Sequence, residues 1–93
     1  MSKPQPLIDA RAKDSFWGVI EDCLVEVHKL SRADAHAKTN DLRTRIERPP
    51  PGISSEPFYH EEPFDIACDL AGRELKLSRY RKQYDAILKR SNW

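Results

Sequence analysis

The placement of proline constrains this chain of 93 residues more than any other feature. Five prolines crowd residues 49–63, whereas residues 7–48 and 64–93 contain none. Proline lacks the amide hydrogen that a helix needs and clashes with the preceding turn, so helices are expected in the two proline-free windows. The chain is therefore predicted to form helices on both sides of a Pro-rich connector at residues 49–62, in which Pro49–Pro51 favours an extended polyproline stretch.

The first window predicts an antiparallel helical hairpin over residues 14–47. One apolar helix face is marked by residues spaced four, three, four and three positions apart, namely Phe16, Ile20, Cys23, Val27 and Leu30. Asp14 can cap this helix, and Ser31 begins a capping-box pattern for a second helix. Because the connection between them is so short, the second helix is expected to return along the first.

The second window predicts two shorter helices. The first runs from about Pro63 to Ala71, with proline in its first turn and Gly72 as its stop. Ser78 is a plausible cap for the last helix, which runs from about Arg79 to Ser91. We therefore predict an all-α fold, a small helical bundle that forms one domain over residues 1–93, with residues 1–13 frayed.

Three aromatic residues in and beside the connector, Phe58, Tyr59 and Phe64, argue against a merely solvated linker. We expect this segment to cross the hairpin and pack on it, since each buried Phe contributes about 2 kcal/mol or more. The apolar face of the first helix is also wider than the second helix can cover. Either the later helices or a second copy of the chain must cover the rest, and a chain this small is marginal alone. A homodimer through the hairpin is therefore one expectation.

The compartment is predicted from cysteine usage and hydropathy. Cys23 and Cys68 lie on apolar helix faces without a Cys-x-x-Cys spacing, so both are expected to be free, buried thiols. Apolar runs are far shorter than the roughly 20 residues that span a bilayer, which predicts no contact with membranes. The start of the chain has no apolar stretch typical of a signal peptide. These features favour a cytoplasmic protein.

Charge is distributed unevenly although the net charge is only +1. Residues 53–72 carry five acidic and no basic groups, and residues 73–93 carry seven basic and two acidic groups. The favoured interpretation is that the third and fourth helices lie antiparallel and neutralise each other. The alternatives are a basic surface for nucleic acid, formed by the last helix, or an acidic surface for a basic partner.

The densest group of potential metal ligands comprises His60, Glu62, Asp65 and Asp69. Imidazole and carboxylate groups suit several divalent ions. Carboxylates at a helix start are, however, already explained by the helix dipole, at up to about 1 kcal/mol each. His28 and His36 flank the hairpin turn and make an incomplete metal site. No catalytic, cofactor-binding or metal-binding residue is therefore predicted.

The sequence thus favours a small cytoplasmic, non-enzymatic module that binds proteins or regulates them, with a second copy or another protein as partner. One alternative is a nucleic-acid-binding protein that uses the outer basic stripe of the last helix, formed by Arg79, Arg81, Lys82, Lys89 and Arg90. A second alternative is a metal-dependent enzyme built on His60, Glu62, Asp65 and Asp69. These residues match no family motif that would decide between them.

Overall fold

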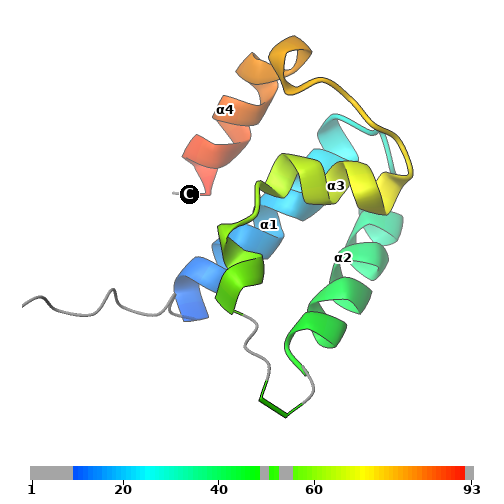
Figure 1. The fold of residues 1–93 in the computed structure, drawn as a ribbon. Coiled ribbons are helices and arrows are strands. Elements are labelled where there is room, and N and C mark those ends of the chain that lie inside the picture. Colours follow the sequence, from blue (N-terminus) through cyan, green and yellow to red (C-terminus); the bar gives the residue numbers. More distant parts are fainter. Residues whose placement is uncertain (1–9, 49–50, 53–55, 92–93) are drawn as a thin grey trace, which may run out of the picture.

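The computed structural model describes residues 10–48, 51–52 and 56–91, and helices dominate this part of the chain (Figure 1). The α-helices are α1 (Ala10–Glu26), α2 (Arg32–Ile46), α3 (Pro63–Ala71) and α4 (Arg81–Arg90). Two short 3-10 helices, η1 (Glu56–His60) and η2 (Leu77–Arg79), lie in the connections. The described ranges contain no strand, and the helices pack on one another. The predicted all-α bundle is confirmed.

Helix α1 is shifted towards the N-terminus relative to the prediction. It begins at Ala10, so residues 10–13 are helical rather than frayed, as suits the strong helix formers Ala and Lys. It ends at Glu26 rather than near Leu30. The reason is Lys29, which has a left-handed backbone with a φ of 64°. This conformation ends the helix and turns the chain back towards α2.

Helix α2 begins where the capping pattern places it. The Ser31 hydroxyl accepts a hydrogen bond from the Asp34 backbone amide at 3.1 Å. The helix then returns antiparallel to α1, which confirms the hairpin (Figure 1). Only Ala35 and Thr39 of α2 are buried. Much of its attachment to α1 is therefore polar.

Helix α1 is the centre of the fold. The other three α-helices pack on it, and α3 crosses it most extensively (Figure 1). The buried residues of α1 are Phe16, Trp17, Val19, Ile20, Cys23 and Leu24. The later helices and η1 cover this face, as one of the two alternatives required, and the homodimer through the hairpin stays a prediction.

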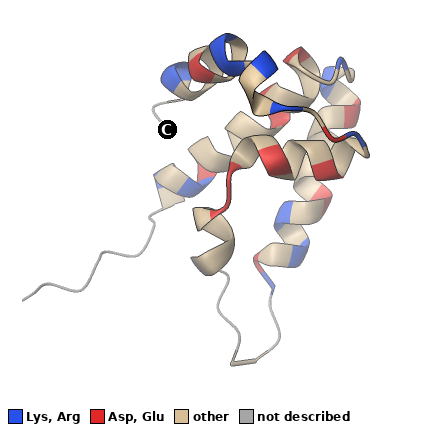
Figure 2. Cartoon of the chain, turned by 45° about the horizontal axis from the view of Figure 1, so that its top comes forward, with Lys and Arg blue, Asp and Glu red and all other residues tan. Residues whose placement is uncertain are grey.

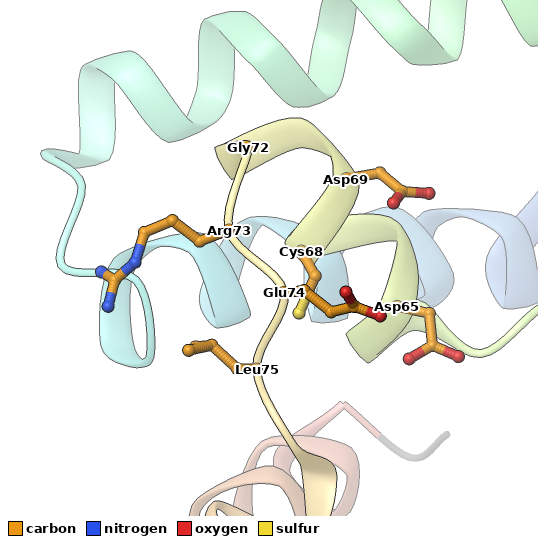
Figure 3. Close-up of a pocket in the computed structure, with 7 residues that line it drawn as sticks. All are labelled: Asp65, Cys68, Asp69, Gly72, Arg73, Glu74 and Leu75. Atoms are coloured by element: carbon orange, nitrogen blue, oxygen red, sulfur yellow. The ribbon is translucent and has the colours of Figure 1, made fainter.

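Helix α3 has the predicted bounds, Pro63–Ala71, and the predicted stop. Gly72 has a φ of 68°, and this left-handed conformation is accessible to glycine without a steric penalty. The turn folds residues 73–75 back along α3, so that they line one cavity together (Figure 3). The local geometry of that cavity therefore depends on the turn at Gly72.

Helix α4 begins two residues later than expected, because Leu77–Arg79 forms η2 and Ser78 makes no cap. Tyr84 and Ile87 are its buried residues. Tyr84 lies edge-on to Phe64, with 5.4 Å between ring centroids, and its hydroxyl donates a hydrogen bond to Glu62. These contacts join α4 to the start of α3.

The aromatic part of the connector packs on α1, as expected. Phe64 is fully buried, Tyr59 is almost so, and Phe58 is half-buried. Phe58 stacks on Trp17 at 5.5 Å between ring centroids, and Trp17 Nε1 donates to the Tyr59 hydroxyl at 3.1 Å. Residues 49–50 and 53–55 lie outside the described residues, as do residues 1–9. The expected polyproline stretch therefore falls largely outside the described part.

Candidate functional site

Figure 2 shows where the charged residues lie along the described chain, and their ion pairs differ from those that the sequence predicted. Acidic side chains of α1 form ion pairs with arginines of α2 and α4. Arg32 of α2 lies 3.0 Å from Glu21 and 2.9 Å from Asp22. Arg90 of α4 pairs with Asp22 and Glu26. The acidic side chains of α1 thus form ion pairs with both α2 and α4.

This pattern replaces the expected pairing of the acidic segment 53–72 with the basic segment 73–93. Across the described residues, no ion pair joins the two segments. Arg81 pairs within α4, with Asp85 at 3.2 Å. The physical reason is the docking of α4, which packs mainly on α1 and brings Arg90 to the acids of that helix. Among the described residues, no ion pair joins the outward carboxylates of α3, Asp65 and Asp69, to a basic side chain.

These carboxylates border a cavity of about 430 Å³ beside α3 (Figure 3). We call this the α3 cavity, and its lining residues are Asp65, Cys68, Asp69, Gly72, Arg73, Glu74 and Leu75. Asp65 and Asp69 are exposed and lie one helical turn apart. Glu74, also exposed, extends its carboxylate towards the side of Asp65 (Figure 3). The cavity thus gathers three acids.

Arg73 is the one basic residue in the lining, and it points the other way. Its side chain extends from the cavity towards the turn between α1 and α2 (Figure 3). The half-buried Leu75 and the almost buried Cys68 add apolar surface. The lining is therefore an acidic rim around an apolar patch, which suits a cationic group on an aliphatic stem.

The thiol in this cavity is not suited to nucleophilic chemistry. Burial raises the pKa of Cys68, a hydrogen bond from the Leu75 backbone lowers it, and the nearby carboxylates raise it again. Burial likewise raises the pKa of Cys23 to about 12. Since the thiolate is the reactive form, both cysteines remain protonated at neutral pH. Both are free thiols, as predicted.

The four residues of the metal-dependent alternative do not form a metal site. Within the described ranges, no three His, Cys, Asp or Glu side chains are arranged to hold a metal ion. His60 lies in η1, and Glu62 accepts the hydrogen bond of Tyr84. Asp65 and Asp69 face outward on α3. Pro63 starts the helix after His60 and Glu62, so the four groups do not share one face.

The two histidines of the hairpin have separate environments. His36 is exposed, and its Nδ1 lies 2.7 Å from Glu21 Oε1, which links α2 to α1. His28 is only 4% exposed, and neither of its ring nitrogens has a hydrogen-bond partner. They form no common site in the described residues. His36 therefore stabilises the hairpin from its surface, whereas the burial of His28 was not predicted from the sequence.

The basic stripe expected on α4 is narrower than the sequence suggests. Arg81 and Arg90 form ion pairs with Asp85 and Glu26, so their charges are partly neutralised. Arg79, Lys82 and Lys89 are exposed. The aromatic residues of this segment, Tyr80 and Tyr84, instead contact Phe64. The outer face of α4 therefore lacks the aromatic platforms on which bases stack.

The cavity residues Arg73, Glu74 and Leu75 were missed at the sequence level. The signal that would have indicated them is Gly72, because a left-handed helix stop returns the following residues towards the helix they leave. Comparisons with family models, with curated proteins and with solved structures found no match for the chain. No helix in the described residues is both long and apolar enough to cross a membrane.

Proposed function

We propose that the chain is a non-enzymatic protein-interaction module that binds a basic segment of a partner protein in the α3 cavity. The observation that carries this proposal is the set of three exposed carboxylates, Asp65, Asp69 and Glu74, which no described cation neutralises. Three exposed carboxylates on one cavity attract positive charge, most strongly at low salt. The Lys or Arg side chains of a partner would supply that charge.

The shape and composition of the cavity support a side chain as the ligand. Its volume of about 430 Å³ admits one or two long side chains. Leu75 and Cys68 offer apolar contact to an aliphatic stem, while the carboxylates receive the charged end. The donor set lacks the convergence that a metal ion would need.

We also propose that the module works in the cytoplasm. Support comes from its two buried free thiols, which a reducing compartment preserves. A second copy of the chain is one partner that fits the charge requirement, because Lys82 and Lys89 are exposed on the outer face of α4. Sedimentation at low and moderate salt distinguishes this self-association from binding to a different protein.

The test is a fluorescence-anisotropy titration of the full chain with a labelled Lys-rich peptide and with the same peptide carrying Glu for Lys. The D69N/E74Q variant should bind the Lys-rich peptide roughly 2- to 30-fold more weakly, from about 0.2–1 kcal/mol for each exposed ion pair. D41N is the matched control. Asp41 is exposed and pairs with Arg45 on α2, away from the cavity. Its affinity should equal that of the wild type.

Two results would overturn the proposal. One is an equal loss of affinity in D41N and in D69N/E74Q, which would indicate non-specific charge attraction. The other is tighter binding of duplex DNA than of the Lys-rich peptide at about 150 mM salt, abolished by K82E/K89E. That outcome would favour the nucleic-acid alternative, because phosphate contacts fall steeply with salt.

A further inference from the structure

His28 is a buried titratable group that the proposed binding function does not use. It lies two residues beyond the end of α1, and its backbone amide donates a hydrogen bond to the Cys23 carbonyl at 3.2 Å. Its side chain is 4% exposed, with both ring nitrogens buried and unpartnered. Polar groups in such a position are normally hydrogen-bonded, because leaving one buried and unpaired costs free energy. An unpaired buried imidazole is therefore unusual.

Arg73 of the α3–α4 connection extends its side chain towards the turn that contains His28, and its positive charge disfavours a proton on that ring (Figure 3). Other charged groups near the turn are engaged elsewhere: Glu26 pairs with Arg90, and Arg32 pairs with Glu21 and Asp22. Lys29, the next residue in the chain, is exposed. No carboxylate in the described residues pairs with the His28 ring.

Arg73 connects His28 to the α3 cavity. It lines the cavity and yet extends its guanidinium towards the α1–α2 turn (Figure 3). On its other side lie the exposed carboxylates of Asp65, Asp69 and Glu74. Arg73 thus has two possible neighbours, a neutral imidazole and a group of acids.

We infer that His28 and Arg73 form a pH switch on the α3 cavity. When the His28 ring gains a proton, it repels Arg73 from the turn and drives it towards the cavity carboxylates, where it competes with the basic side chains of a partner. Acidification would therefore weaken binding of a basic segment. This inference rests on the proposed function, because it concerns the regulation of the same cavity.

The direction of the effect follows from the environment of the ring. Burial, and secondarily the charge of Arg73, lower the pKa of His28 from 6.5. The packed arrangement therefore holds the neutral ring, and an arrangement in which the ring reaches water binds the proton more readily. Between pH 7.5 and pH 5.5, the opened population should rise by up to about tenfold relative to the packed one.

Hydrogen exchange of the full chain, corrected for intrinsic rates, tests the switch directly. Amides at residues 27–31 and 72–76 should lose up to about tenfold in protection between pH 7.5 and pH 5.5 in the wild type. The H28L variant should show no such loss. An equal loss in both proteins, or none in the wild type, would overturn the inference.

Binding of the Lys-rich peptide at the two pH values supplies a second readout that does not depend on H28L folding. Affinity should fall on acidification in the wild type and in the matched control K76M, which removes a neighbouring exposed cation. In R73M it should stay constant. A fall in R73M equal to that of the wild type contradicts the switch. A chain that binds no peptide at pH 7.5 contradicts the proposed function, and the exchange measurement then decides the pH response by itself.

Discussion

Truncating Phe64 should remove a large part of the stability of this protein. The side chain is fully buried where α3 meets α4, with its ring 5.4 Å from that of Tyr84 and 6.2 Å from that of Tyr80. A Phe→Ala change in a packed core costs about 3–5 kcal/mol. The edge-on contact with Tyr84, at about 0.5–1.5 kcal/mol, favours the upper part of that range.

The consequence is measurable because small domains have little stability to lose. At roughly 0.05–0.15 kcal/mol per residue, a chain of this length has about 5–14 kcal/mol in total. Each kcal/mol corresponds to about 4–8 °C in Tm for a domain of this size, so F64A should melt at least about 12 °C lower. Circular dichroism during thermal and urea unfolding measures both quantities. F58A is the comparison, and the half-buried Phe58 should cost about half as much or less.

An unchanged Tm in F64A would refute this reasoning. It would mean that α3 does not anchor α4 and that residues 56–64 form a loose linker. An F58A loss larger than that of F64A would likewise contradict the burial order of the two rings. Either result would contradict the packing of α3 that positions the α3 cavity.

Three further predictions concern single sites. K29G should raise the free energy of unfolding by about 0.5–1 kcal/mol, because glycine adopts the left-handed backbone of residue 29 without strain. K38G is the control: residue 38 is exposed within α2, and glycine there should lower the free energy of unfolding by about 1 kcal/mol. Urea unfolding measures both changes. T39V should raise the free energy of unfolding by about 1 kcal/mol or more, because the buried Thr39 hydroxyl that it removes has no hydrogen-bond partner. A lower free energy of unfolding in T39V would show that the hydroxyl is hydrogen-bonded. Cys23 and Cys68 should react slowly with a thiol reagent in the native protein and yield two thiols per chain after non-reducing denaturation, whereas a count of zero would contradict their free state.

Local signals explain which parts of the fold the sequence predicted well. Proline at the first turn and glycine just past the last turn set the bounds of α3, because both residues act through their own backbone. Ser31 as the cap of α2 is a signal of the same kind. The burial of Phe64 was predictable because three aromatic residues lie close together there, and a solvated linker would not be stabilised by them.

Features that depend on tertiary packing were not predictable in the same way. The early end of α1 arises at Lys29, a residue type that rarely adopts the left-handed conformation. The partner of Arg90 depends on which helix α4 packs against, and a count of charges by segment carries no such information. His28 lies in the turn between α1 and α2, and its burial depends on tertiary packing that the sequence pattern does not indicate.

The central claim is that the acidic α3 cavity is the surface this protein uses. Amide chemical shifts of the isotope-labelled full chain during titration with the Lys-rich peptide test it most directly. The largest changes should occur at residues 65–75, and D69N/E74Q should reduce them while D41N should not. Changes centred on α2, or spread evenly over the molecule, would contradict it.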